Sequence, residues 1–283
     1  MSGEPRRARL DRDALTPLPV DVVSIQSQVV YGRVGNSVAV PTLQSLGLDV
    51  VAVPTVLLSN VPHYDTLHGG PLPTEWFAGF LSDLERRRAL ERARVVLVGY
   101  LGPPEQTLAL ADWLERVLVE YPHLKLVLDP VMGDGDVGLY VHEDTPGLLR
   151  DRLVPMAHGI APNAFEFELV VGRPTPTYAE TLAAARELLE TNLDWVVVTS
   201  AAPADTPPGR MRVAVVTRDE DHLLEHELVE SHAKGTGDLF AAALVGAMLR
   251  GYSVKGAAQV AAERTVAVLR RTAELGCGEL VLV

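Results

Sequence analysis

The chain has 283 residues, of which 47% are hydrophobic and 22% charged, as in a globular protein with a large core. Its formal net charge of −12 argues against a nucleic-acid partner, because nucleic-acid-binding proteins present a basic face. The longest apolar stretch, Phe240 to Leu249, is far shorter than the ~20 residues that cross a bilayer. We therefore expect a soluble protein without a membrane partner. The single cysteine, Cys277, cannot form an internal disulfide, which agrees with a cytoplasmic location.

The N-terminal segment differs in composition from the rest of the chain. Residues 1–19 contain four arginines and three prolines but no apolar stretch of the kind that a signal peptide requires. We predict a flexible tail over residues 1–19. The remainder, residues 20–283, is predicted to form a single domain, since three-layer α/β sheets of this size commonly do so.

Short apolar runs then alternate with longer helix-patterned runs. The predicted strands are 21–25, 50–53, 94–98, 125–128, 159–161 and 195–199, and the predicted helices between them are 37–46, 74–93, 104–120 and 178–191. An antiparallel pair, 212–217 and 223–230, precedes the final helices 236–250 and 253–274. This alternation predicts a three-layer α/β/α fold, with a mostly parallel sheet and an antiparallel edge. Ligands bind such sheets at the carboxyl ends of the strands.

Polar residues follow three of the predicted strands. Asp129 and Asp134 follow the 125–128 strand, and two carboxylates suit a hydrated magnesium ion, although a turn rich in Gly and Asp uses the same residues. Asn163 and Glu166 lie one helical turn apart after the next strand, a spacing that a helix capping box shares. Thr199 and Ser200 end a further strand and can donate to phosphate oxygens or serve as ordinary turn residues.

An apolar helix near the C-terminus opens on the residues Gly235, Thr236, Gly237 and Asp238. The first N–H groups of a helix lack internal partners and lie at the positive end of its dipole, so they hold anions. An aspartate at such an anion site suggests a role in orienting or deprotonating a hydroxyl that attacks phosphorus. Taken alone, the pattern also fits a helix N-terminus with a coincidental acid.

The order of these clusters resembles that of the ribokinase-like kinases, and the N-terminal third carries more specific motifs. These motifs are Ser27-Gln28-Val29-Val30-Tyr31-Gly32, Val34-Gly35-Asn36-Ser37, the run from Val53 to Asn60, Pro62-His63-Tyr64-Asp65 and Gly99-Tyr100. They are similar to the motifs of pyridoxal kinases, and the later ones to the bacterial pyridoxal/pyridoxine/pyridoxamine kinase branch in particular. The resemblance extends from about Asp21 to about Arg271 and implies a ribokinase-like fold.

The resemblance implies a role for each candidate residue. On the vitamer side, it implies that Ser27 hydrogen-bonds the pyridine ring, that Val34 and Tyr100 pack around it, and that His63 faces its polar edge. On the nucleotide side, it implies that a group of four residues organises magnesium, a monovalent cation and the phosphates, with Asp129 and Glu166 closest to the metal; the four are Asp129, Asp134, Asn163 and Glu166. Thr199, Ser200 and Thr236 correspond to phosphate contacts, and Tyr140 lies on a segment similar to the mobile flap. Asp238 corresponds to the catalytic base.

The implied activity is transfer of a phosphoryl group from MgATP to the 5′-hydroxymethyl oxygen of pyridoxal, and also of pyridoxine and pyridoxamine, in vitamin B6 salvage. In this mechanism the N–H groups of Gly235, Thr236 and Gly237 stabilise the charge on the γ-phosphate. The resemblance also implies a homodimer.

Two positions depart from the pattern of the family. Ala161 replaces a threonine that some relatives have near the monovalent-cation site, which puts K⁺ dependence in question, and Val61 replaces a polar residue.

Three other functions are compatible with parts of the pattern. A hydroxymethylpyrimidine kinase carries out the same reaction on a smaller ring. A sugar kinase fits less well, because Ser27, Tyr100 and their apolar neighbours suit an aromatic ring. A non-catalytic pyridoxal phosphate carrier would not need Asp238. Lys234, which precedes Gly235, is expected to contact substrate, and we hypothesise that it traps the product aldehyde as an imine if burial makes its amine nucleophilic.

Overall fold

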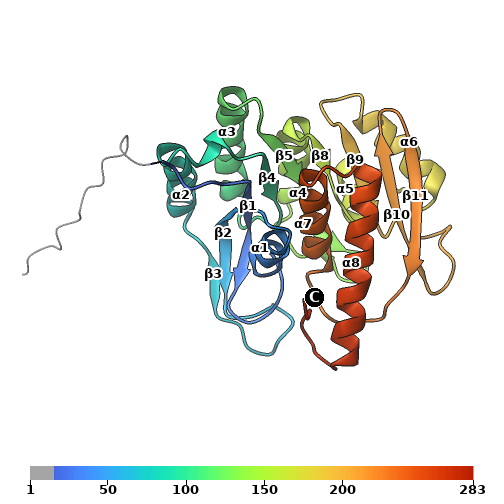
Figure 1. Cartoon of the computed structure of the whole chain (residues 1–283). Helices are drawn as coiled ribbons and strands as arrows, with labels where there is room; N and C mark the ends of the chain where they lie inside the picture. The colour runs from blue at the N-terminus through green and yellow to red at the C-terminus, as the bar shows by residue number, and fades with distance from the viewer. Residues whose placement is uncertain (1–15, 283) are drawn as a thin grey trace, which may run out of the picture.

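A nine-stranded sheet organises the computed structural model, which describes residues 16–282 (Figure 1). The strand order is β11-β10-β9-β8-β5-β4-β1-β2-β3, and the strands from β2 to β9 run parallel. The strands are β1 (Val22–Val29), β2 (Val50–Leu58), β3 (Gly69–Pro71), β4 (Val95–Val98), β5 (Lys125–Leu128), β8 (Gly159–Ile160), β9 (Trp195–Thr199), β10 (Arg210–Thr217) and β11 (Asp221–Glu227). The antiparallel pair β10 and β11 confirms the predicted edge, and β3 adds a second antiparallel edge.

Helices cover both faces of this sheet, which confirms the predicted α/β fold with three layers (Figure 1). One face is covered by α1 (Asn36–Ser45), α7 (Thr236–Leu249) and α8 (Val254–Glu274). The other is covered by α2 (Thr74–Arg86), α3 (Pro104–Glu120), α5 (Ala164–Val171) and α6 (Tyr178–Leu188). Shorter elements are the hairpin β6 (Gly133–Asp134) and β7 (Gly138–Leu139), α4 (Thr145–Leu148), and the turns η2 (Ala89–Glu91), η3 (Leu149–Leu153) and η4 (Val154–Met156). No helix among the described residues is long and apolar enough to span a membrane.

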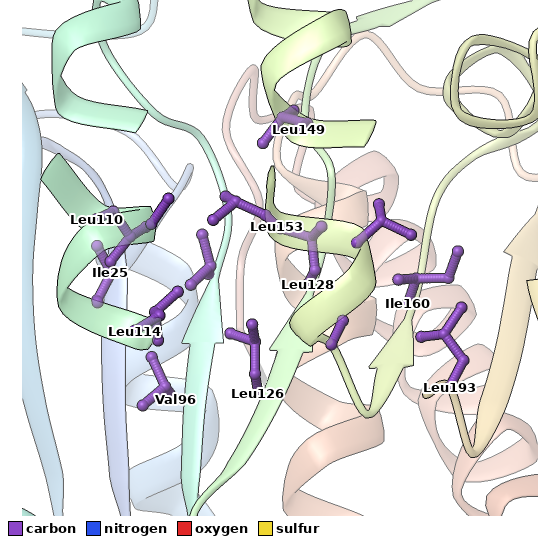
Figure 2. Close-up of a cluster of buried hydrophobic side chains, with 14 of the residues drawn as sticks. Ile25, Val96, Leu110, Leu114, Leu126, Leu128, Leu149, Leu153, Ile160 and Leu193 are labelled. Carbon is purple, nitrogen blue, oxygen red and sulfur yellow. The ribbon is translucent and has the colours of Figure 1, made fainter. Parts of the chain in front are cut away.

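The central strands are apolar on both faces because both faces are buried. In β4, Val95 and Leu97 face the α1, α7 and α8 layer, whereas Val96 and Val98 face the opposite layer. On that opposite side, Ile25 of β1 and Val96 pack near Leu110 and Leu114 of α3, and further leucines together with Ile160 continue the cluster across the sheet (Figure 2). Burying one such side chain stabilises the fold by about 1.5–3 kcal/mol.

Three predicted element ends, those of β1, β2 and α2, are wrong for identifiable reasons. Strands β1 and β2 run to Val29 and Leu58, beyond the predicted ends, although Pro54 lacks an N–H group. A register shift opposite Gln26 and Gln28 accommodates this part of β2, which continues to pair with β3 at the edge of the sheet. Helix α2 ends at Arg86, seven residues before its predicted end, because the chain reverses at Arg88, where φ is 61°.

The predicted flexible tail, residues 1–19, lies mostly outside the described residues. At the other end, the segment after α8 turns back onto the protein. Its Leu280 is buried together with Val38 of α1, Leu239 of α7 and Val268 of α8. The segment around Leu280 is therefore packed beside the start of α7, where the sequence predicts catalysis.

Candidate active site

The start of α7 is formed by a backbone conformation that requires glycine. Gly235 precedes the helix with φ 91° and ψ 11°, in the left-handed region. A Cβ atom at this position would overlap the carbonyl oxygen of Arg33, in the loop between β1 and α1. Helix α7 is therefore held closely against that loop, and its first N–H groups, at Thr236, Gly237 and Asp238, have no acceptor within the helix. Two of them, Thr236 and Gly237, belong to the set that the sequence predicts to bind an anion; the third predicted donor, Gly235, directly precedes the helix.

The same loop holds Asp238 directly. The N–H group of Gly35 donates a hydrogen bond of 2.9 Å to Oδ2 of Asp238. Gly35 also lies against Ser27, since a Cβ atom at Gly35 would overlap the carbonyl oxygen and the hydroxyl of Ser27. Its φ of 52° is again in the left-handed region. Gly35 thus brings the predicted vitamer-binding serine and the predicted catalytic base next to each other, although 211 positions separate Ser27 from Asp238.

The Asp238 carboxyl is only partly exposed, and its ionisation is shifted accordingly. Burial raises the pKa of Asp238 to about 6 from an ordinary value of 3.8, and the hydrogen bond from Gly35 partly offsets this rise. A carboxylate with this pKa is ionised at neutral pH but is a stronger proton acceptor than an exposed aspartate. This ionisation suits a group that receives a proton from an alcohol.

We expect Asp238→Asn to raise the free energy of unfolding at pH 7.5, in metal-free buffer, and to leave it nearly unchanged at pH 4. The folded pKa lies above the unfolded one, so the unfolded state binds fewer protons between about pH 4 and pH 6, and stability falls as the pH rises through this window. Near pH 4 the folded side chain is protonated and as neutral as asparagine. Denaturant titrations at both pH values check this, with the exposed Asp219→Asn as control. An equal gain at both pH values would contradict the ionisation argument.

A second acidic group lies close to Asp238. Asp129, directly after β5, is 4% exposed, and its Oδ2 atom is buried without a hydrogen-bond partner in the described structure. Burial, together with the negative charges of Glu166 and Asp238, raises the pKa of Asp129 well above its ordinary value. Three carboxylates therefore share one poorly hydrated region. Their negative charges repel one another, and this repulsion is relieved when a cation binds among them.

Glu166 has a structural role that the sequence left open. It forms a capping box with Asn163 at the start of α5: the Glu166 N–H donates to Asn163 Oδ1, and the Asn163 N–H donates to Glu166 Oε2, each at 2.9 Å. Oε1 of Glu166 also accepts the N–H of Met132 at 3.0 Å, and Asn163 Nδ2 donates to the carbonyl oxygen of Gly133 at 2.9 Å. Both residues thus hold the 129–134 loop in place. Their direct contact with a metal or a nucleotide remains a prediction.

Neighbouring strand ends complete this edge of the sheet. Thr199 forms a parallel bridge with Asn163, and its N–H donates to the carbonyl oxygen of Pro162 at 2.9 Å. Ser200 follows with φ 52°, a conformation that is uncommon for a residue other than glycine and that occurs often at functional sites. The predicted phosphate-contact residues Thr199 and Ser200 therefore lie on the same edge as Asn163. Asp134 is exposed in the hairpin that leads from Asp129.

Tyr140 links this acidic region to the predicted vitamer side. Its ring stacks on the ring of Tyr100, with the centroids 6.4 Å apart and the planes at 29°. Burial raises the pKa of Tyr140, and so do the nearby charges, which belong to Glu166, Asp238, Asp129 and Asp134. The sequence resemblance assigns Tyr140 to the nucleotide and Tyr100 to the vitamer. The structure places the two rings in contact, at the boundary between the two predicted subsites.

The remaining vitamer candidates lie on loops around this point. Val34 is partly exposed and adjoins Gly35, and a Cβ atom at Gly235 would lie 3.3 Å from the Cα of Val34. The side chain of His63 is 36% exposed, on the loop between β2 and β3. Lys234 is exposed, so the burial on which the imine hypothesis depends is not observed, and that hypothesis lacks its structural premise.

Two residues with clear contacts were missed by the sequence reasoning. Gly35 appeared there only within a motif, whereas its N–H group is the donor that holds Asp238. Glu279 was not considered, yet its Oε2 atom accepts the N–H of Arg33 at 3.0 Å. The Val34-Gly35-Asn36-Ser37 motif was an available signal for Gly35. Nothing in the local sequence around Glu279 points to a contact 246 positions away.

Comparisons with known proteins find similar sequences and a similar solved structure. A family model described as phosphomethylpyrimidine kinase matches residues 92–282. A pyridoxine/pyridoxal/pyridoxamine kinase from Bordetella bronchiseptica is 55% identical over 269 residues, which are 95% of each protein. A pyridoxal kinase PdxY from Deinococcus radiodurans is 36% identical over 278 residues, 96% of this chain and 93% of that protein. The solved structure of a pyridoxal kinase from Leishmania donovani in complex with ADP and pyridoxamine has a TM-score of 0.81 and 29% identity, covering 93% of this chain and 90% of that one.

Proposed function

The chain belongs to the pyridoxine/pyridoxal/pyridoxamine kinase family, as its motifs predicted, and we propose that it transfers the γ-phosphoryl group of ATP to the 5′-hydroxymethyl oxygen of pyridoxal. Pyridoxine and pyridoxamine carry the same hydroxymethyl group and are proposed as further substrates. The enzyme is thus a kinase of vitamin B6 salvage. Relatives that are kinases, one of them solved with ADP bound, support ATP as the phosphoryl donor and do not support the carrier alternative.

The observation that best supports this reaction is the position of Asp238. It lies in the first turn of α7, beside N–H groups that can hold a phosphate, and the loop that carries Ser27 and Gly35 contacts it directly. An alcohol bound by Ser27 would therefore be close to the carboxylate. In the proposed mechanism Asp238 orients the hydroxyl and accepts its proton, while the N–H groups of Gly235, Thr236 and Gly237 stabilise the transferred charge.

The acidic residues fit a magnesium ion that retains most of its water. The described residues contain no group of three or more His, Cys, Asp or Glu side chains arranged to hold a metal. Asp129, however, offers a buried carboxylate oxygen without a partner, close to Glu166 and Asp238. Mg²⁺ takes oxygen ligands and commonly binds through one or two carboxylates together with substrate phosphates. We propose that Asp129 and Glu166 together hold the ion. The bound ion would neutralise negative charge on the phosphates.

A coupled ATP assay tests the proposed reaction and its nearest rival together. Purified enzyme is supplied with MgATP and one of four alcohols: pyridoxal, pyridoxine, pyridoxamine or hydroxymethylpyrimidine. We expect the highest kcat/KM values with the three vitamers. The family model described as phosphomethylpyrimidine kinase favours hydroxymethylpyrimidine as the second candidate. A higher kcat/KM for hydroxymethylpyrimidine than for all three vitamers would reassign the substrate.

We expect Ser27→Ala to raise the KM for pyridoxal by a few-fold to about tenfold, with little change in the KM for ATP. The physical reason is that one neutral hydrogen bond contributes about 0.5–1.5 kcal/mol, which here would be made to the vitamer alone. Ser27 is 8% exposed and lies against Gly35, so alanine fits the same space. Initial rates with each substrate varied in turn give both constants. Equal increases in the two KM values would show that Ser27 does not contact the vitamer.

The finer assignments remain proposals from family resemblance. We propose a homodimer, a cytoplasmic location and a single kinase domain over residues 20–283. K⁺ is proposed as an optional activating ion, since Ala161 occupies the position where some relatives have a threonine. Rates measured in potassium and sodium buffers of equal ionic strength test the ion requirement.

A further inference from the structure

The carboxylate of Glu279 lies where two loops of the proposed vitamer site meet. Its side chain is 12% exposed, on the segment that follows α8. Oε2 of Glu279 accepts the N–H of Arg33 at 3.0 Å, in the loop between β1 and α1. The contact is close, since a Cβ atom at the neighbouring Gly32 would lie 3.0 Å from the same oxygen and 2.7 Å from Val61. The C-terminal segment and both loops therefore pack together at this point.

The other side of this carboxylate faces the loop between β2 and β3. Nε2 of His63 is 3.9 Å from Oε1 of Glu279. The Glu279 carboxylate beside the Tyr64 hydroxyl raises the pKa of Tyr64 to about 12. The rings of His63 and Tyr64 lie against each other, with their centroids 4.4 Å apart. One carboxylate therefore hydrogen-bonds the β1–α1 loop at Arg33 and faces the β2–β3 loop at His63, where its Oε1 atom is buried without a hydrogen-bond partner in the described structure.

The contact at Arg33 leads directly to the catalytic residue. Glu279 binds the N–H of Arg33, while the carbonyl oxygen of Arg33 packs against Gly235 at the start of α7. Two residues further along the chain, the N–H of Gly35 donates to Asp238. The position of Arg33 therefore affects both Gly35, which touches Ser27, and the first turn of α7. A shift of this loop would move the vitamer contacts relative to Asp238.

We propose that Glu279 is a positioning residue, which fixes the β1–α1 and β2–β3 loops relative to each other and to Asp238 so that the vitamer is captured in a productive orientation. This role rests on the proposed vitamer kinase function. It does not require Glu279 to touch the reacting atoms. Because Glu279 contacts the two vitamer loops and not the 129–134 loop or the end of β9, its loss should affect the vitamer more than ATP.

The test is the KM of each substrate in Glu279→Ala. A hydrogen bond to a charged acceptor typically changes an equilibrium by about tenfold or more, so we expect the KM for pyridoxal to rise roughly tenfold or more. The KM for ATP should stay close to that of the wild type, and the Tm should fall by several degrees because a hydrogen bond of the folded enzyme is lost. The matched control is Glu274→Ala, an exposed acid at the end of α8 that pairs with Arg271 at 3.7 Å, which should change neither KM.

A second variant separates the contribution of the charge of Glu279 from that of its hydrogen bond. Glu279→Gln keeps the size and an acceptor for the Arg33 N–H but removes the charge, so we expect its KM for pyridoxal to rise by about threefold, between wild type and Glu279→Ala. If Glu279→Ala does not fold, a rise in the KM for pyridoxal but not in the KM for ATP in Glu279→Gln is sufficient to support the proposal. A KM for pyridoxal equal to that of the wild type, or equal rises for pyridoxal and ATP, overturns the proposal. Wild-type enzyme that does not phosphorylate pyridoxal would instead refute the proposed function.

Discussion

Asp238→Asn is expected to lower kcat by roughly 10²–10⁴, the usual contribution of a general base, while the protein remains folded and binds ATP. The carboxylate lies in the first turn of α7 and accepts the N–H of Gly35 at 2.9 Å, and its raised pKa of about 6 makes it an effective proton acceptor at neutral pH. Asparagine retains an oxygen that can accept from Gly35 but cannot take up a proton. Single-turnover rates with pyridoxal and MgATP measure the loss at the chemical step.

The control for this experiment is Asp219→Asn, which makes the same chemical change at an exposed position after β10. It should retain full activity. ATP affinity measured by calorimetry should be similar in both variants and in the wild type. A loss of less than tenfold in Asp238→Asn would remove this residue from the chemical step. The gain in stability expected for the same variant at pH 7.5 would show that the wild-type residue is retained there despite its cost to folding.

Gly235→Ala is expected to abolish most activity and to destabilise the fold more than an ordinary glycine substitution does. Two costs combine: the residue has φ 91°, and a Cβ atom would overlap the carbonyl oxygen of Arg33. The left-handed conformation alone costs a residue with a side chain about 1–2 kcal/mol. Relieving the overlap must move the β1–α1 loop away from α7, and a displacement of about 1 Å at a reacting centre can cost 10²-fold in rate. Denaturant midpoints and kcat measure the two effects.

Gly251→Ala is the matched control. Gly251 has φ 95°, close to that of Gly235, but a Cβ atom there would have no neighbour within 4 Å. This variant should show the conformational cost alone and should keep its kcat. If both variants lose equal stability and neither loses activity, the contact between Gly235 and Arg33 is not important for catalysis.

Much of the candidate site could be proposed from the sequence because its residues stand in short segments. Gly235, Thr236, Gly237 and Asp238 are consecutive, and a helix N-terminus presents its N–H groups whatever the surroundings. Glu166 and Asn163 were predicted as a pair because a three-residue spacing sets the geometry of a capping box. The fold was predictable for a similar reason. Alternation of apolar strands and amphipathic helices allows few arrangements other than a parallel sheet covered on both faces.

Errors arose where neighbours that are distant in sequence decide the local structure. The strand from Val50 was predicted to end at Val53, yet β2 continues to Leu58 because β3 pairs with it and a register shift accommodates Pro54. Lys234 was given a conditional role that depends on burial, and its exposure follows from how the segment before α7 packs, which no local pattern specifies. Helix α5 was not predicted, although the pair Asn163 and Glu166 at its start was considered both as a ligand pair and as a capping box.

By itself, the sequence determined the layers of the fold, the family and the chemical groups available for catalysis, because periodicity and short motifs act within a few residues. Only the tertiary structure decided which of those groups meet. Ser27 and Asp238 become neighbours through the backbone of Gly35, and Glu279 reaches Arg33 from the other end of the chain. These contacts are made largely by backbone N–H and carbonyl groups, which every residue type carries, and so their pairing leaves little trace in the sequence.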